Sequence, residues 1–515
     1  MKPAAVYLIG AGPGDPSLIS VRGFRYLSTA DVVVYDHLVH HRLLRSVRPD
    51  AEQIDVGAAA PRPMEQDAIN FLLADKARDG KMVARLKWGD PFVFDSGGKE
   101  ALFLHSQGIP FEVVPGVPPT IGSPCYAGVP LTYPEAGDAL VFIRGHEAET
   151  DTPPNVDWEK VASLAGTVVS YAGGGQLEVI IDELLSHGRS ADEPAALILR
   201  GTLPTQRTIE GTLSEIQKVV RDAQRRGSGV LVVGPVVGLR EYLRWFDSRP
   251  LFGKRILVTR PEDQAAELVD RLWSLGADPI EAPTIRVIPP EDDGPLDAAC
   301  DQAGTFDWIV FTSVNGVDSF MRHLCRGSRD VRELKGVRLC AIGPATAERL
   351  AGYNLRVDLV PDEHRAEAVV VALREHDTLS GQRILLPRAD LAREVLPKEL
   401  RRAGAEVVDV TAYQTVLAGG DKGTGPDIYR MLLEQEIDVV TLTSASTVKN
   451  LVKILGKDPA ADLLNMTVVA AIGPVTAEAA SQLDIRTTIM PTTYTVPALV
   501  DAIVTHFAKG ELRTG

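Results

Sequence analysis

The sequence predicts an α/β protein made of two halves, each built from two lobes. Apolar runs typical of strands alternate with stretches of helical periodicity, starting with AAVYLIGAG and SLISVRGFRYLSTA, which indicates mostly parallel sheets flanked by helices. The second half is duplicated, because GKRILVTRPEDQ at Gly253 returns as GQRILLPRADLA at Gly381, an offset of 381 − 253 = 128. A helix end, Pro250 and a new buried strand mark the junction of the halves.

We expect the first half to span residues 1–248 and a linker to follow at 249–253. The loop PLTYPEAGDA closes one α/β segment and the strand ALVFIRGH opens the next. The first half therefore divides into lobes at about 1–136 and 137–248.

The second half spans residues 254–515, and a repeat of this length indicates a doubled domain rather than a solenoid. We expect lobe one to combine about 254–288 with 418–515, and lobe two to span about 289–417. Ligands commonly bind in the cleft between two such lobes.

Composition excludes several classes of function. The 515 residues are 45% hydrophobic and 24% charged, and the net charge of −15 disfavours a nucleic-acid partner, which needs a basic face. No window resembles a membrane span or a signal peptide, so a cytoplasmic location is expected. The four cysteines lie far apart and the histidines lack ligand spacing, so we expect neither a disulfide framework nor a metal site.

The first strand runs into the glycine turn Gly10-Ala11-Gly12. This turn differs from a dinucleotide-binding fingerprint, because Asp15 takes the place of the third glycine and Pro13 has no N–H for a phosphate. S-adenosylmethionine has no phosphates and suits such a turn, since glycines allow close backbone approach. On spacing alone, a simple strand-to-helix turn is the better explanation of the motif.

Further segments follow in a fixed order: the glycine turn, RLKWGDPFVFDSGG, GIPFEVVPGV, YAGVPLT and RGTLPTQRTIEGTL. In this order they resemble the uroporphyrinogen-III C-methyltransferases, from about Lys2 to Phe246. The resemblance implies a two-lobed tetrapyrrole-methylase-like half that uses S-adenosylmethionine to convert uroporphyrinogen III to precorrin-2.

By position, the resemblance makes Asp36 the proton acceptor. It also implies cofactor contacts at Pro13, Trp88, Gly89, Asp90, Val93, Pro118, Pro119, Ala172 and Gly201.

The chain departs from the family pattern at several motif positions. The family's VGKR becomes Val56-Gly57-Ala58-Ala59, so the lysine assigned as proton donor is absent. Changes elsewhere place Trp88 in GGD, Ser96 and Lys99 in GRGGEE, Pro134 in THR and Ala172 in YMG. Two readings follow: an active methyltransferase with an altered pocket, or a scaffold domain with impaired catalysis.

Uroporphyrinogen carries eight carboxylates, so its pocket needs cations. Arg85, Lys87 and Arg144 remain in the first half and are candidates to compensate for the arginines lost from the motifs.

In the second half, VTRP, FTSVNGV, CAIGPATAE, LPRAD, VTAYQT, LTSAST and AIGPVTAE resemble uroporphyrinogen-III synthase. The resemblance implies two lobes joined by a pair of crossover strands, and cyclisation of hydroxymethylbilane with inversion of its last ring, without metal or organic cofactor. The enzyme must hold a folded conformer and deliver a proton to the leaving hydroxyl.

Tyr413 is the candidate proton donor by resemblance. By the same resemblance, Thr346, Thr476 and Ser444 line the site as hydrogen-bonding residues. Thr312 and Ser313 precede one helix and Ser444 precedes its counterpart, so the helix N-terminal amides can hold substrate carboxylates. Arg260 and Arg388, at equivalent places in the two repeats, are the candidates to supply positive charge. Simpler roles compete, because such hydroxyls also serve as helix N-caps and Tyr413 also suits a core.

The sequence therefore predicts a bifunctional enzyme of tetrapyrrole biosynthesis, in which the product of the second half is the substrate of the first. Its partners are small tetrapyrroles, and the resemblance implies a homodimer formed through the first half. A synthase with a scaffold domain and a non-catalytic sensor of acidic small molecules are the alternatives.

Overall fold

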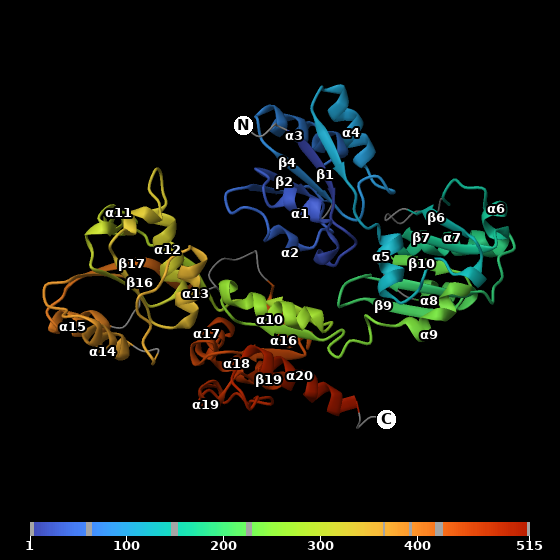
Figure 1. The fold of residues 1–515 in the computed structure, drawn as a ribbon. Helices are drawn as coiled ribbons and strands as arrows, with labels where there is room; N and C mark the ends of the chain where they lie inside the picture. Colours follow the sequence, from blue (N-terminus) through green and yellow to red (C-terminus); the bar gives the residue numbers. More distant parts are fainter. Residues whose placement is uncertain are drawn as a thin grey trace. The chain divides into compact units, whose positions relative to one another are not determined.

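The computed structural model describes residues 5–57, 64–145, 153–222, 229–363, 366–390, 394–417 and 426–511. Two compact units divide the chain: residues 1–256 with 270–279 and 500–515, and residues 257–269 with 280–499. The described residues form four sheets flanked by helices, which confirms the predicted α/β class (Figure 1). The position Ala58, where the family has its lysine, lies outside the described residues.

The first sheet is parallel throughout and has the order β3-β2-β4-β1-β5. Its strands are β1 (Val6–Gly10), β2 (Val32–Tyr35), β3 (Glu52–Asp55), β4 (Val83–Lys87) and β5 (Phe111–Val114). Apolar residues of α3 (Gln66–Arg78) and α4 (Gly97–Ser106) cover one face, and those of α1 (Val21–Leu27) and α2 (His41–Leu44) cover the other. The carboxyl ends of β1 and β4 therefore lie at one edge.

The second sheet has the order β6-β7-β10-β8-β9. Its strands are β6 (Ala139–Arg144), β7 (Gly166–Ala172), β8 (Pro194–Leu199), β9 (Arg207–Thr212) and β10 (Gly229–Val233). The expectation of a mostly parallel sheet is wrong here, because only β6 and β7 pair in parallel. A short loop joins β8 to β9, and neighbouring strands joined without a crossover helix are antiparallel.

The helices of this lobe lie on both faces of the second sheet. α6 (Trp158–Ser163), α7 (Gly174–Ser186) and α8 (Leu213–Asp222) bury apolar residues against one face. The other face packs against the end of α5 (Pro119–Tyr126) and the short helical turn before α9 (Arg240–Leu243).

The duplication predicted from the sequence appears as two related sheets, with orders β12-β11-β18-β19 and β13-β17-β16-β14-β15. The first contains β11 (Arg255–Val258), β12 (Asp278–Glu281), β18 (Val439–Leu442) and β19 (Val468–Ala471). The second contains β13 (Ile285–Ile288), β14 (Trp308–Phe311), β15 (Arg338–Ala341), β16 (Arg383–Ala389) and β17 (Glu406–Leu417).

Equivalent helices follow equivalent strands in the two repeats. α12 (Val314–Leu324) and α13 (Pro344–Gly352) of one repeat correspond to α17 (Ala445–Leu455) and α19 (Pro474–Ser481) of the other. The remaining helices are α10 (Glu262–Ser274), α11 (Gly294–Asp301), α14 (Ala366–His376), α15 (Val395–Arg402), α16 (Ile428–Leu433), α18 (Lys457–Asn465) and α20 (Val496–Glu511).

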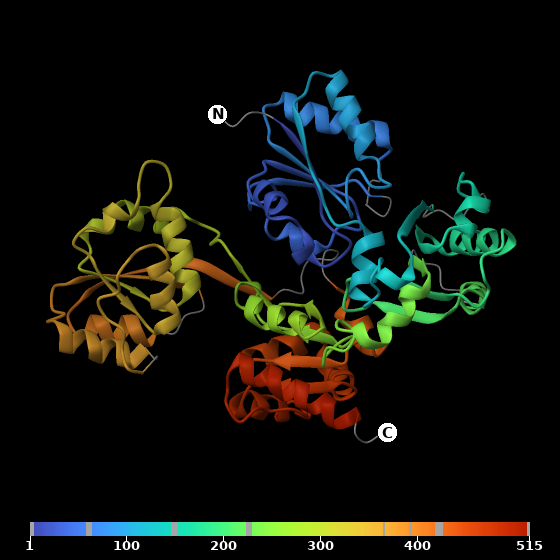
Figure 2. The same ribbon diagram turned by 45° about the vertical axis from the view of Figure 1, so that its right-hand side comes forward.

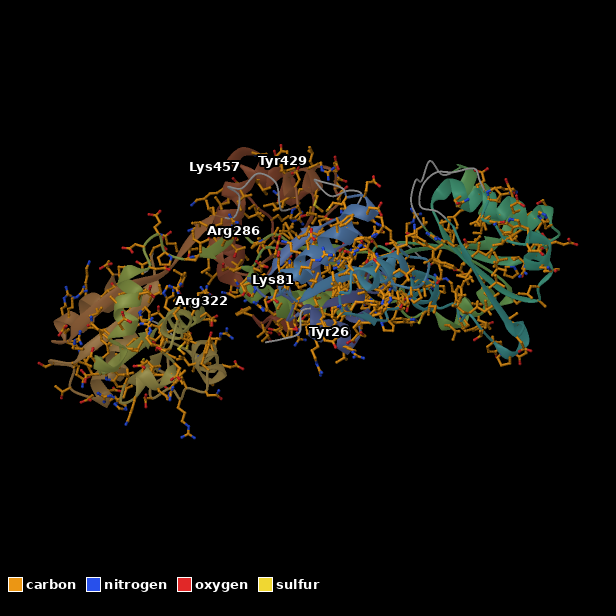
Figure 3. The ribbon with its side chains drawn as sticks, turned by 90° about the horizontal axis from the view of Figure 1, so that it is seen from above. Tyr26, Lys81, Arg286, Arg322, Tyr429 and Lys457 are labelled. Carbon is orange, nitrogen blue, oxygen red and sulfur yellow. The ribbon has the colours of Figure 1, made fainter. Side chains whose placement is uncertain are left out.

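Two strands form the connection between the repeats. β17 is 12 residues long and pairs with β16 in its first part and antiparallel with β13 in its last part, from Gln414 to Leu417 (Figure 2). Arg286, which is labelled in Figure 3, lies on β13 in this pair. The predicted pair of crossover strands is therefore present. Among the helices in the described part of the chain, none has the length and apolar character needed to cross a membrane.

Candidate active sites

Backbone segments approach closely where the loops after β1 and β4 meet. Gly12 and Gly89 form an antiparallel bridge, with N···O distances of 3.2 and 2.9 Å. A Cβ atom on Gly10 would lie 2.5 Å from the Cα of Gly116, and one on Gly89 would lie 2.8 Å from Cδ of Pro119. Side chains are therefore excluded, and the resulting glycine cradle suits a cofactor that contacts backbone without needing phosphate donors.

The second lobe of this half contributes the loop between β8 and β9. Asp15 links to it, because its backbone N donates to Oγ1 of Thr202 at 3.0 Å while its carboxylate accepts from the Tyr126 hydroxyl at 2.9 Å. A Cβ atom on Gly201 would lie 2.1 Å from Oγ of Ser123. Thr202 has a φ of 69°, and a β-branched residue in this region is strained. Such strain is commonly found at functional sites.

The fold brings most of the predicted cofactor residues to this edge. A Cβ atom on Gly122 would meet both Pro13, at 2.7 Å, and Thr202, at 3.5 Å, which links the glycine turn to the loop of Gly201. Pro118 precedes α5 and Pro119 starts it, while Ala172 ends β7 and is fully buried. Val93 is 39% exposed.

The carboxylate of Asp90 accepts two backbone hydrogen bonds at this edge. Its Oδ1 accepts from the backbone N of Phe92 at 2.8 Å, and its Oδ2 accepts from the backbone N of Gly116 at 2.9 Å. The side chain therefore holds two loops together, and its predicted contact with the cofactor stays a prediction.

Trp88 lies at the same edge. Its indole Nε1 donates to the carbonyl oxygen of Pro13 at 3.0 Å, and its ring centroid lies 5.0 Å from that of Tyr171. Its backbone N donates to Oδ2 of Asp36 at 3.4 Å. The residue that departs from the family's glycine thus contacts the loop after β1, the second lobe and the predicted proton acceptor.

Asp36 belongs to a buried ion cluster. Arg85 and Lys87 occupy alternate positions of β4, and the side chains of both are 1% exposed. Arg85 donates to Asp36 at 2.5 Å and to Glu100 at 3.2 Å, and Lys87 lies 3.1 Å from Asp95 and 3.2 Å from Glu100. Both cations are therefore balanced by carboxylates of the same lobe. The expectation that they compensate for the arginines lost from the motifs stays a prediction.

The cluster sets the charge of its carboxyl groups. Burial alone would raise the pKa of Asp36, but the charges of Arg85 and Lys87 outweigh burial and the pKa is lowered. Asp36 is therefore ionised at neutral pH and is suited to accept a proton rather than to donate one. Burial raises the pKa of Asp95, against the attraction of Lys87. The pairing of Asp95 and Glu100 with these cations was not predicted from the sequence, although the alternation of Arg85 and Lys87 on one strand face was a usable signal.

In the synthase-like half, Tyr413 lies on β17 and Ser313 precedes α12. Their hydroxyl oxygens are 3.0 Å apart, and Ser313 also accepts from the backbone N of Gly316 at 3.0 Å. Tyr413 is 9% exposed and contributes its ring to a hydrophobic core. The tyrosine is thus both a core aromatic and a polar group positioned at a helix N-terminus.

In the other repeat, the equivalent serine makes different contacts. Ser444 caps α17 as Ser313 caps α12, accepting from the backbone N of Thr447 at 3.1 Å. Its hydroxyl lies 2.9 Å from that of Ser446 and 2.8 Å from that of Thr447. The capping role considered in the sequence analysis is therefore present in both repeats, whereas the Ser313–Tyr413 contact is found in one.

The other predicted substrate residues differ in exposure. Thr346 and Thr476 occupy equivalent places in α13 and α19 and are both 4% exposed. Thr312 and Arg260 are partly buried at the ends of β14 and β11. Their roles in substrate binding stay predictions.

Arg388 is buried on β16. Its Nε donates to Oδ1 of Asp409 at 2.6 Å, and a second donor reaches the other oxygen of the same carboxylate. The positive charge of Arg388 is therefore neutralised by a carboxylate of the same lobe. Its predicted contact with substrate carboxylates stays a prediction.

Comparison with known proteins identifies both halves. Residues 5–217 match the tetrapyrrole (corrin/porphyrin) methylases, and residues 266–501 match the uroporphyrinogen-III synthase HemD family. The chain is 34% identical over 505 residues to the porphyrin biosynthesis protein HemD of Ruminiclostridium josui, and the match covers 98% of each chain. The chain belongs to this family of fused porphyrin-biosynthesis proteins.

Two further relatives resemble parts of the chain. The uroporphyrinogen-III C-methyltransferase of Bacillus subtilis is 36% identical over 386 residues, covering 74% of this chain and 79% of the relative. The solved uroporphyrin-III C-methyltransferase of Thermus thermophilus, in complex with S-adenosyl homocysteine, is 36% identical and covers 46% of this chain and 99% of its own, with a TM-score of 0.39.

The family assignment confirms both resemblances found in the sequence. The fused porphyrin-biosynthesis protein is a bifunctional enzyme of tetrapyrrole biosynthesis, with an S-adenosylmethionine-dependent C-methyltransferase half and a uroporphyrinogen-III synthase half.

Proposed function

We propose that the synthase half cyclises hydroxymethylbilane to uroporphyrinogen III and that the methyltransferase half converts this product to precorrin-2. The Ser313–Tyr413 contact of 3.0 Å supports the first reaction, because the serine orients a phenol that can protonate the departing hydroxyl. The hydroxyls of Thr312, Ser444, Thr346 and Thr476, with Arg260 and Arg388, bind the folded substrate.

In the methyltransferase half, S-adenosylmethionine supplies an activated methyl group when bound. The glycine cradle around Gly12 and Gly89 binds the cofactor, and Asp36 accepts the proton released from the methylated pyrrole carbon. Arg85 holds the carboxylate of Asp36 in place through a hydrogen bond of 2.5 Å. The protein thus contributes alignment of the bound cofactor with the substrate and a carboxylate that accepts the released proton.

The test is incubation of the full chain with hydroxymethylbilane, with and without S-adenosylmethionine. Without the cofactor we expect the asymmetric isomer, uroporphyrinogen III, and with it a macrocycle heavier by two methyl groups. Spontaneous closure to the symmetrical isomer would contradict the synthase activity. An unmethylated product in the presence of cofactor would favour the second candidate, a scaffold role, for which the bulk of Trp88 beside the cradle is the supporting observation.

We also propose domain boundaries at 1–248, 249–253 and 254–515, a cytoplasmic location and a homodimer formed through the methyltransferase half. The apolar side chains of Phe92 and Leu102 are 58% and 72% exposed and support an interface there. Sedimentation of the full chain should give twice the monomer mass, and a monomer at micromolar concentration would contradict the dimer.

A further inference from the structure

Trp88 bridges the two lobes of the methyltransferase half. Its indole donates to the carbonyl oxygen of Pro13, in the loop after β1, and its ring contacts Tyr171 on β7. Both partners lie within one compact unit of the structure. A single side chain therefore spans the edge at which the loops of the two lobes converge.

The indole lies directly beside the glycine cradle. Gly89, the next residue, forms the bridge with Gly12, and Ala172, the residue after Tyr171, is fully buried at the end of β7. Both Gly89 and Ala172 are among the predicted cofactor contacts. The side chain of Trp88 therefore occupies space beside the cradle and hydrogen-bonds the carbonyl oxygen of Pro13. A glycine at the same position would leave both the space and the carbonyl oxygen accessible.

Trp88 also contacts Asp36, the predicted proton acceptor. The backbone N of Trp88 donates to Oδ2 of Asp36 at 3.4 Å, while the side chain of the same residue is tied to Pro13. One residue thus connects the loop of Pro13 with the carboxylate of Asp36.

We propose that Trp88 is a latch that closes the cofactor site and must release Pro13 and Tyr171 before S-adenosylmethionine binds. This proposal rests on the methyltransferase function proposed above. Opening the latch breaks one hydrogen bond and one ring contact, so removal of the indole should tighten cofactor binding by about tenfold to hundredfold. The latch makes cofactor affinity depend on the position of Trp88, whose backbone N donates to Asp36.

The experiment is calorimetric titration of the full chain with S-adenosylhomocysteine, using the variants Trp88→Gly, Trp88→Ala and Trp88→Phe. The matched control is Trp245→Phe, because Trp245 likewise donates through its indole to a backbone carbonyl, that of Cys125, at 2.9 Å. We expect the glycine and alanine variants to bind at least about tenfold more tightly, the phenylalanine variant to be intermediate, and the control to match wild type. Thermal unfolding identifies any variant that fails to fold.

A second readout follows the indole itself. The emission of Trp88, obtained by subtracting the spectrum of Trp88→Phe, should become more accessible to acrylamide as S-adenosylhomocysteine is added. Increased protection, or weaker binding by Trp88→Ala, would overturn the latch and leave the methyltransferase function intact. Absence of binding in wild type and in every Trp88 variant would overturn both.

Discussion

The hydroxyl groups of Ser313 and Tyr413 lie 3.0 Å apart although 100 residues separate them in the chain. Ser313 is fixed by its capping bond to the backbone N of Gly316, so it provides a rigid partner for the phenol. The contact places one ionisable hydroxyl at the N-terminus of α12. The equivalent serine of the other repeat, Ser444, contacts Ser446 and Thr447 instead.

Replacement of Tyr413 by phenylalanine should slow enzymatic ring closure by about a hundredfold, because it removes the proton donor and keeps the ring in the core. Ser313→Ala should have a smaller effect on the maximal rate and alter its pH profile, since it removes the hydroxyl that contacts the phenol. The ratio of the two uroporphyrinogen isomers measures both changes. Unchanged rates in Tyr413→Phe would remove its assigned role. Tyr429→Phe, at a side chain that is 46% exposed, serves as the matched control.

Replacement of Asp36 by asparagine should reduce methyl transfer by about a hundredfold or more, because the amide does not accept the proton. It should also lower the midpoint of thermal unfolding, since Arg85 is 1% exposed and loses a carboxylate partner. Synthase activity of the same preparation provides the internal control. Methyl transfer at the wild-type rate would show that another group accepts the proton.

The ion cluster should make stability depend on pH in acid. The pKa of Asp36 and that of Glu100 are lowered by Arg85 and Lys87 despite burial, so their contribution is present above the unfolded values of 3.8 and 4.5 and is lost as pH falls through the folded values. Burial raises the pKa of Asp95, so its ionisation lowers the stability of the folded state as pH rises, opposite to the effect of Asp36 and Glu100.

Thermal unfolding of wild type should therefore shift to lower temperature below about pH 4.5. Glu100→Gln should be less stable at pH 7 and show a shallower dependence between pH 7 and 3. Glu241→Gln, at an exposed position of α9, is the control. If the midpoint of thermal unfolding fell equally with pH in wild type and in Glu100→Gln, Glu100 would be excluded as a source of the acid sensitivity.

Replacement of Tyr126 by phenylalanine should lower the free energy of unfolding by about 2 kcal/mol, because a buried hydrogen bond to a charged carboxylate is lost. Tyr126 is 9% exposed and ties α5 to Asp15 in the glycine turn, so cofactor affinity should also fall. Denaturant unfolding measures the first effect and calorimetry the second. Tyr133→Phe, at a side chain that is 42% exposed, should change neither.

The order of the motifs was sufficient to predict both halves. The glycines of these motifs are required by the local backbone. Gly89 has a φ of 73°, which other residues rarely adopt, and a Cβ atom on Gly201 would collide with Ser123. The antiparallel pairing of β10 with β7 and β8 was not predictable in the same way. Pairing direction depends on where a strand inserts into the sheet, which local periodicity does not encode.

The sequence by itself determined the duplicated architecture, the glycine cradle and the identity of Asp36 and Tyr413 as candidates, because repeats and turn residues are local properties of the chain. Tertiary structure alone decided that Arg85 and Lys87 are neutralised within their lobe, that Ser313 holds Tyr413, and that Trp88 spans from Pro13 to Tyr171. Charge balance and hydrogen-bond partners depend on distances between residues remote in the chain, and those distances exist only once the sheets have formed.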